Sequence, residues 1–440
     1  MQNNSISRLM PTVLAVCLIA LLNLSVVAQK SGDTQHSDFG SSLKRYGNKE
    51  KNSPADKEKK SSDNEESIRV ETNLVVNDVL VVNQKGNAIL GLQKSDFVIT
   101  EDGKPQEVAM FSPGENSTIP RSIVLIIDRG FIALDYIQKS IDAAKDLVDK
   151  LRPQDKMAIV TSDVKLLTDF TGDKIKLKNS LDKFKNSFSI LSYNPNPYSP
   201  NHREEWKTMM KKTFFNSDAG RSSEFSSLLA VLNELFENTN SRPIVILQSN
   251  GRELYLLKPM NERFKKANEK KQIFENEPLE KKRERDFGFK DVLEAVVRSG
   301  ATIYSAIPGL QLVGLSEQEQ ETNIKKMNDI RSATNMGGKQ YSADLIKNVI
   351  QWAREEGPAD QSALIQIAKS SGGYADFLEK PEDADRIYSS IVTVINNRYT
   401  IGYYPTNQTH DGRQRNFKIE VRGHPEYLIL DRKTYFAPNS

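Results

Sequence analysis

The stretch IVLIIDRG, residues 123–130, places Asp128 directly after a run of apolar residues. A strand that is covered on both faces of a parallel sheet is apolar throughout, so a run that ends in aspartate brings a carboxylate to the rim of the sheet. At that rim, the carboxylate of Asp128 could hold a metal ion, attack a substrate or cap the following helix. Which of these roles it has depends on its companion residues.

If Asp128 were the nucleophile of a hydrolase, the other catalytic residues that such an enzyme needs would be missing from the sequence. In phosphatases of the haloacid dehalogenase type such an aspartate attacks phosphorus, and a second aspartate follows two positions later, where this chain has Gly130. The sequence places no histidine at a strand end near Asp128, which argues against a Ser–His–Asp arrangement. The four histidines are His36, His202, His410 and His424. The SSGG stretch at 370–373 lacks the Lys-Ser/Thr of a phosphate loop and more simply predicts a turn between a helix and a strand. We therefore predict no enzymatic activity and no catalytic residue.

Strands and helices alternate along residues 119–398, and this alternation must position Asp128. Apolar residues recur at helical spacing after the first strand, at Leu134, Ile137, Ile141, Ala144, Leu147, Val148 and Leu151. Further strands are predicted at KMAIVTSD, RPIVILQSN and ATIYSAIPG, with helices between them. The pattern predicts an α/β fold with a doubly wound, mainly parallel sheet. Three stretches interrupt it: a Pro/Asn-rich segment at 192–206, a charged segment at 262–287, and an irregular region from Leu312 to about Asp360.

Shorter β segments flank this domain at residues 68–118 and 399–440. The first contains the turn signals NQKGN and EDGKP between partly alternating apolar runs. Neither segment is long enough to bury a core alone. We therefore predict that the two segments form one β-sandwich, into which the α/β domain of residues 119–398 is inserted.

The N-terminus predicts export. Arg8 precedes an apolar run, and Val26 and Ala28 are the small residues that a signal peptidase requires, so residues 1–28 are expected to be a signal peptide. An uncleaved membrane anchor is the alternative, because the run is nearly long enough to span a bilayer. Cys17, the only cysteine, lies in this run, so the cleaved chain would have no thiol. Residues 29–67 have almost no apolar side chains and predict a disordered linker.

The expected location is the periplasm, the cell envelope or the extracellular space, with no membrane span after signal cleavage. The chain has 61 basic and 58 acidic residues, a formal net charge of +3. A nucleic-acid partner would require a concentrated basic excess, so none is expected.

Eight segments follow one another in a recognisable order: GLQKSDFVITEDGKPQEVAMF, SIVLIIDRG, LRPQDKMAIV, LLTDFTGD, RPIVILQSNG, GATIYSAI, IAKSSGGYADF and RYTIGYYP. In this order they resemble the VWFA-related family of exported bacterial proteins, the acidobacterial-type group, in which a von Willebrand factor A (VWA) domain is flanked by β segments. The resemblance covers most of the chain from about Ile68 onward. It implies a VWA/Rossmann-like sheet and a protein partner.

The resemblance also implies where a divalent cation would bind, because VWA domains hold one at the rim of the sheet and use it to bind a carboxylate of the partner. Asp128 matches the first aspartate of the Asp-x-Ser-x-Ser motif, but Gly130 and Ile132 stand where the two serines belong. Ser223 falls near the ligand threonine. Asn250 replaces the aspartate of the third loop.

These departures reduce the metal ligands to Asp128, Ser223 and Asn250, with one carboxylate in place of two. Mg²⁺ requires several oxygen ligands in near-octahedral geometry. We therefore predict a degenerate metal-ion-dependent adhesion site that holds a divalent cation such as Mg²⁺ weakly if at all. Arg129 could neutralise Asp128 where an ion otherwise would. A helix N-cap is the favoured structural role for Asp128.

The partner-binding rim is expected where residues 128–132, 220–225 and 249–253 meet. Its candidate residues are Asp128, Arg129, Gly130, Ser223 and Asn250. The alternative is that these loops are ordinary polar turns. The leading expectation is an exported, non-catalytic, adhesion-type module that binds an unidentified protein. The alternatives are an Asp-dependent hydrolase and a cell-envelope structural or assembly factor that acts through its β-sandwich.

Overall fold

The computed structural model describes residues 44–45, 74–114, 117–128, 134–162, 164–189, 224–236, 241–252, 254, 288–334, 351 and 353–439. The expected signal peptide, most of the expected linker, and the stretches 192–206 and 262–287 lie outside the described residues. Within the described ranges, no helix combines the length and the apolar character needed to cross a bilayer.

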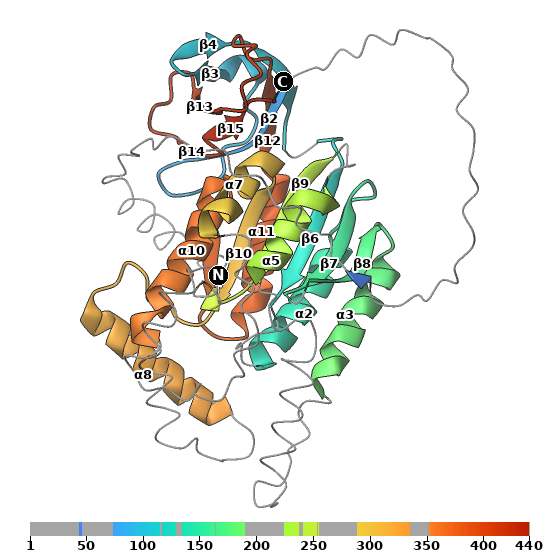
Figure 1. The fold of residues 1–440 in the computed structure, drawn as a ribbon, viewed down its shortest axis with the longest axis vertical. Helices are drawn as coiled ribbons and strands as arrows, with labels where there is room; N and C mark the ends of the chain where they lie inside the picture. Colours follow the sequence, from blue (N-terminus) through green and yellow to red (C-terminus); the bar gives the residue numbers. More distant parts are fainter. Residues whose placement is uncertain are drawn as a thin grey trace, which may run out of the picture.

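A mainly parallel sheet forms the centre of the α/β domain (Figure 1). Its strands in the described residues, in spatial order, are β1 (Lys44–Arg45), β8 (Lys165–Thr171), β7 (Lys156–Thr161), β6 (Arg121–Ile127), β9 (Arg242–Gln248), β10 (Thr302–Pro308) and β11 (Ala375–Leu378). Neighbouring strands are parallel except for β7 and β8. The predicted sheet is confirmed, but β8 was not among the predicted strands. It is a half-exposed strand, and its burial alternates too weakly to give a clear signal.

Helices cover both faces of this sheet (Figure 1). One face carries α2 (Leu134–Asp149), α3 (Lys174–Ser189) and α11 (Asp383–Asn396). The other carries α5 (Glu224–Ala230) with its π-helical continuation η4 (Val231–Leu235), α7 (Phe289–Ser299) and α10 (Gly357–Ser370). Alternate residues of β6 enter the two cores, with Leu125 in one and Val124 and Ile126 in the other. A strand covered on both faces needs an apolar side chain at every position, which explains the unbroken run at 123–127.

Helix α8 (Glu317–Thr334) corrects the sequence analysis, which indicated an irregular region there. The helix is strongly polar. In the described part of the chain, its apolar contact is a small cluster that contains Leu312, Ile324 and Ala353. A helix with such a narrow apolar stripe gives little of the 3.6-residue periodicity on which sequence prediction depends.

The β segments from the two ends of the chain form two four-stranded antiparallel sheets. One contains β14 (Leu428–Leu430), β2 (Val75–Val82), β12 (Tyr399–Tyr403) and β5 (Val108–Ser112), and the other contains β15 (Thr434–Phe436), β13 (Gln414–Val421), β3 (Phe97–Glu101) and β4 (Lys104–Gln106). Buried residues of both sheets, such as Val79 and Ile419, belong to a single hydrophobic cluster. Each sheet combines strands from both ends of the chain, as the predicted β-sandwich requires.

The β3–β4 hairpin confirms one local prediction in detail. After the short 3₁₀ helix η1 (Lys94–Asp96), strand β3 leads to a pair of facing residues, Glu101 and Lys104. Between them, Asp102 and Gly103 both have positive φ, 45° and 80°. Positive φ at both central residues defines a type I′ turn, for which Asp-Gly is a favoured sequence. The EDGKP signal is therefore a two-residue hairpin.

The β-sandwich packs against the amino-terminal ends of the central strands through buried polar side chains. Arg398, whose residue is 1% exposed, donates from Nη2 to the carbonyl oxygens of Asp78 in β2 (3.1 Å) and Gly372, just before β11. Its Nη1 donates to the hydroxyl of Tyr304 in β10 (3.3 Å). Arg242, at the start of β9, pairs with the carboxylate of Asp78 (2.7 Å). The carboxyl ends of the strands lie at the opposite edge, away from the sandwich.

A second buried ion-pair network joins the start of β6 to the loop before β7. The Asp155 carboxylate accepts hydrogen bonds from Arg121 Nε (3.0 Å) and Arg152 Nε (3.2 Å), and from the backbone amides of both arginines (3.2 and 3.0 Å). Burial by itself raises the pKa of Asp155. The hydrogen bonds from Arg121 and Arg152 outweigh burial and hold this pKa below its ordinary value of 3.8.

We expect Asp155→Asn to lower the free energy of unfolding at pH 7 by about 3 kcal/mol, because Arg121 stays buried without its carboxylate. The folded-state pKa of Asp155 is depressed. Its contribution is therefore complete above the unfolded value of about 3.9 and is lost as the pH falls through the folded value. Urea unfolding from pH 7 downward should show the gap between wild type and variant closing only in this acidic range. A gap that is constant with pH would contradict the assignment. Asp149→Asn, at an exposed ion pair with Lys178, is the control.

Candidate functional site

Asp128 lies at the carboxyl end of β6, where the order of strands reverses. β6 stands between β7 on one side and β9 on the other, and ligands of open α/β sheets bind in the crevice at such a switch point. Asp128 is 2% exposed. Ser249 Oγ donates a hydrogen bond to Asp128 Oδ2 (2.9 Å), and the amide of Asp128 donates to the carbonyl oxygen of Gln248 (2.9 Å). The carboxylate is therefore held by the end of the neighbouring strand.

The segment after β9 is a tight loop that its own side chains stabilise. Ser249 Oγ accepts a hydrogen bond from the amide of Gly251 (3.0 Å), and Asn250 Oδ1 accepts one from the amide of Arg252 (3.0 Å), which is an Asx turn. Gly251 has φ +70°, and a Cβ there would lie 2.5 Å from the carbonyl oxygen of Asp360. Only glycine fits this approach to α10. The loop is thus pinned beside Asp128.

Helix α5 approaches the same edge of the sheet. Ser227 Oγ donates to the carbonyl oxygen of Thr161, the last residue of β7 (2.8 Å), and accepts a hydrogen bond from the amide of Val164 (3.1 Å). Val164 has φ 56°, unusual for a β-branched residue, and these contacts hold that turn in place. Helix α5 therefore packs against the turn that follows β7, at the edge of the sheet where Asp128 lies.

Tyr388 of α11 forms a hydrogen bond with the last residue of β9, just before the rim loop. Its hydroxyl donates to Gln248 Oε1 (2.9 Å), and both residues are buried. Burial raises the pKa of Tyr388, so its hydroxyl stays protonated and remains a hydrogen-bond donor at neutral pH. The last residue of β9, which leads into Ser249 and Asn250, is thereby fixed in orientation.

The structure brings together two of the predicted rim residues, Asp128 and Asn250, at the ends of adjacent strands. Arg129, Gly130 and Ser223 lie outside the described residues. The described part of α2 begins at Leu134 and residues 129–133 lie outside the described residues, so the N-cap role of Asp128 stays a prediction.

Ser249, which sequence reasoning missed, contacts the carboxylate of Asp128. Its position just after a buried strand, and next to Asn250, was the available signal. Its orientation toward Asp128 was not visible in the sequence, because the contact joins residues 121 positions apart.

The donor set at the rim differs from that of a strong metal site. In the described ranges, no group of three or more His, Cys, Asp or Glu side chains is close enough together to hold a metal ion. Among the described residues beside Asp128, the side-chain oxygens are one carboxylate, one hydroxyl and one amide, from Asp128, Ser249 and Asn250. The hydroxyl already donates to Asp128, and the amide oxygen already accepts from the loop. Such a set suits hydrogen bonding to a partner better than octahedral coordination of Mg²⁺.

Comparisons with known proteins give similarities of fold at low identity. No family model and no curated protein matches the chain. An aerotolerance-related membrane protein from Bacteroides fragilis is similar at a TM-score of 0.32 and 12% identity, over 62% of this chain and 98% of that one. The vWF domain of a type V pili tip protein from Porphyromonas gingivalis is similar at a TM-score of 0.28 and 11% identity, over 64% of this chain and 96% of that one. The manganese-loaded TRAP protein of Plasmodium vivax is similar at a TM-score of 0.24 and 10% identity, over 76% of this chain and 97% of that one.

The assignment of the fold therefore depends on features of this chain itself. These are the mainly parallel sheet with β6 at its centre, the strand β8 that runs antiparallel to β7, helices on both faces, and an aspartate directly after the central strand. The protein has a VWA-like α/β fold, which carries a β-sandwich built from both ends of the chain.

Proposed function

We propose that this protein is an exported, non-catalytic binding module, and that its protein partner docks at the rim formed by Asp128 and residues 249–252 without a tightly bound metal. The observation that carries the proposal is the contact of Ser249 with the buried Asp128 carboxylate at the switch point of the sheet. This is the edge at which open α/β sheets bind their ligands. The β-sandwich packs at the opposite edge of the sheet and does not cover the rim (Figure 1).

The same geometry argues against a hydrolase. A nucleophilic carboxylate must reach its substrate, whereas Asp128 is buried and accepts a hydrogen bond from Ser249. The described histidines, His410 and His424, belong to the β-sandwich at the other edge of the sheet and are not placed to serve as its base. Turnover of p-nitrophenyl phosphate that is lost in Asp128→Asn would nevertheless restore the hydrolase interpretation.

Site-specific cross-linking tests the docking edge. A photoreactive p-benzoylphenylalanine at Arg252, in the rim loop, should give a discrete covalent adduct with one protein in the source cells. The matched position is Tyr404, an aromatic residue that is 51% exposed on the sandwich and should give none. Adducts from position 404 but not from position 252 would refute docking of the partner at the rim. They would favour the alternative function, an envelope assembly factor that acts through its β-sandwich.

A metal-independent rim also predicts the thermal behaviour of the chain. The melting temperature should be the same in EDTA and in millimolar Mg²⁺, Mn²⁺ or Ca²⁺. A cation that binds only the folded state must raise the melting temperature, so a clear increase that disappears in Asp128→Ala would show that the site holds metal after all. Asp149→Ala on the surface of α2 is the control, because its carboxylate lies away from the rim.

A further inference from the structure

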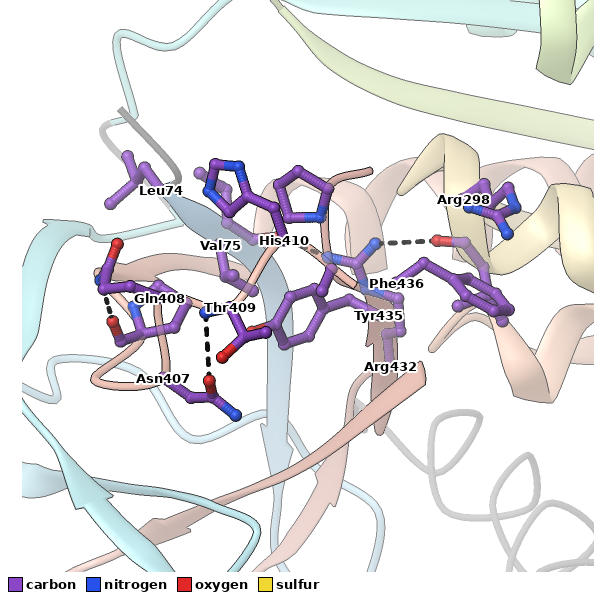
Figure 2. Close-up of a pocket in the computed structure, with 15 residues that line it drawn as sticks. Leu74, Val75, Arg298, Asn407, Gln408, Thr409, His410, Arg432, Tyr435 and Phe436 are labelled. Carbon is purple, nitrogen blue, oxygen red and sulfur yellow. Dashed lines mark hydrogen bonds between the residues drawn. The ribbon is translucent and has the colours of Figure 1, made fainter. Parts of the chain in front are cut away.

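A pocket of about 200 Å³ lies at the junction of the β-sandwich and the end of α7, far from the rim (Figure 2). Figure 2 shows the loop residues Asn407 and Gln408 on one side and Arg298 of α7 on the other, with Tyr435 and Phe436 between them. The volume is below the roughly 300–1,000 Å³ of pockets for drug-sized ligands, so its occupant must be small.

The described residues that line the pocket combine apolar and basic side chains and include no carboxylate. The apolar part comes from valine, leucine, proline and aromatic residues, among them Val75 and Tyr435, which are buried. The cationic side chains are Arg298 and Arg432, with the imidazole of His410 nearby. An apolar wall beside guanidinium groups is complementary to an apolar molecule that ends in a negative charge.

Arg432 is the strongest sign that the pocket favours an anion. The residue is 7% exposed, and its guanidinium donates to the carbonyl oxygens of Val76 (2.8 Å) and Val297 (3.3 Å), both in the pocket wall. Its Nε has no hydrogen-bond partner in the described structure. The carboxylates of Asp78 and Asp431 interact with it electrostatically, but neither lines the pocket. Burial lowers the pKa of Arg432 despite these two carboxylates, so an anion in the pocket would further offset the cost of burying its charge.

The Val297 carbonyl oxygen belongs to the last turn of α7, whose helix dipole puts partial negative charge there and would repel an anion. Arg432 donates to this oxygen, and Arg298 adds a second positive charge on the same turn. The guanidinium of Arg298 lies 3.9 Å from the centre of the Phe436 ring and pairs with Glu294, one turn earlier, at 2.8 Å. This surface pair is weak, so Arg298 can exchange Glu294 for a ligand carboxylate at little cost.

The opposite wall is preformed. Asn407 Oδ1 accepts a hydrogen bond from the amide of Thr409 (3.2 Å), and buried Arg415 donates to the carbonyl oxygen of Thr409 (2.8 Å). The loop thus keeps its shape without a ligand, which reduces the entropy lost on binding.

We propose that this pocket binds a small apolar carboxylate, with the carboxylate at Arg298 and Arg432 and the apolar body against the valine and aromatic side chains. The site is independent of the rim, since it lies at the other edge of the central sheet and uses none of the rim residues. It would give the protein a small-molecule ligand in addition to a protein partner.

A pair of isosteric probes tests the charge requirement, 4-fluorobenzoate and the uncharged 4-fluorobenzamide, titrated into the full chain. We expect the carboxylate to bind with a Kd of about 1–10 mM, as a fragment of this size allows. It should shift the methyl NMR signals of the pocket residues Val75, Val76 and Val297 and leave Val124 and Val245 in the central sheet unchanged. The amide should bind at least about tenfold more weakly, because it lacks the charge-assisted hydrogen bond.

Arg298→Gln removes one charge from the pocket at a partly exposed position, so the variant should fold, and it should weaken 4-fluorobenzoate binding by about tenfold. Arg413→Gln, at a side chain that is 83% exposed and outside the pocket, should leave binding unchanged. Three outcomes would overturn the proposal: equal binding of benzoate and benzamide, insensitivity to Arg298→Gln, or methyl shifts confined to other parts of the protein.

Discussion

Replacing Arg398 by methionine should destabilise the protein by about 3–5 kcal/mol, because one side chain holds together two bodies of the fold. Its Nη2 donates to the carbonyl oxygens of Asp78 and Leu430 in the sandwich and of Gly372 in the α/β domain. Methionine fills similar volume but donates nothing. Buried carbonyl oxygens left without a donor cost about 1–3 kcal/mol each, and the buried carboxylate of Asp431 also loses a compensating charge.

Urea unfolding of the purified chain measures this effect, and the form of the curve adds a second readout. If Arg398 couples the sandwich to the α/β domain, the variant should unfold at a lower midpoint and with a broader or split transition. Arg422→Met is the matched control, because Arg422 is exposed at the end of β13 and should change the midpoint little. An unchanged midpoint in Arg398→Met would show that hydrophobic packing alone joins the two bodies.

Gly373→Ala should lower the free energy of unfolding by about 3 kcal/mol or more, although the substitution adds only a single methyl group. Gly373 lies just before β11, and a Cβ built there would be 1.9 Å from the carbonyl oxygen of Ile303 in β10 and 2.8 Å from its carbonyl carbon. Both atoms are backbone of a central strand and cannot rotate away. The amide of Gly373 is also held by the carbonyl oxygen of Ala368 (2.9 Å), so the loop has little freedom to retreat.

The control for this effect is Gly423→Ala. Gly423 has φ +75°, but no atom lies within 4 Å of the position that its Cβ would take. Gly423→Ala should therefore lower the free energy of unfolding by only about 1–2 kcal/mol, which is the cost of a Cβ on a residue in the left-handed conformation. Thermal or urea unfolding of both variants compares steric overlap with backbone strain. A smaller loss in Gly373→Ala than in Gly423→Ala would show that β10 and the loop can separate without penalty.

The SSGG stretch shows how a local motif acquires its meaning from tertiary contacts. As a phosphate loop it was a weak match, and a turn between helix and strand was the simpler expectation. The structure confirms the turn. Ser371 Oγ accepts a hydrogen bond from the amide of Ile303 (2.8 Å), Gly372 has φ +78°, and Gly373 gives β10 room to pass. The serine and glycine residues of this stretch are explained by close packing against β10, without a role in phosphate binding.

Elements with a strong local signal were predictable from the sequence. The apolar run that ends at Asp128 implied a strand covered on both faces, and the EDGKP stretch implied a hairpin turn. Elements without such a signal were not. Helix α8 is polar on most of its surface and β8 is half exposed, so neither has the periodicity by which core-facing residues are recognised.

For the candidate site, the sequence by itself determined which residues end the buried strands, and therefore that Asp128 and Asn250 share one edge of the sheet. Only the tertiary structure decided that Ser249 donates to the Asp128 carboxylate and that Arg432 is buried beside a pocket. The physical reason is the range of the interactions. Periodicity and turn chemistry act over a few residues, whereas hydrogen bonds and burial depend on side chains that the fold brings together from more than a hundred positions apart.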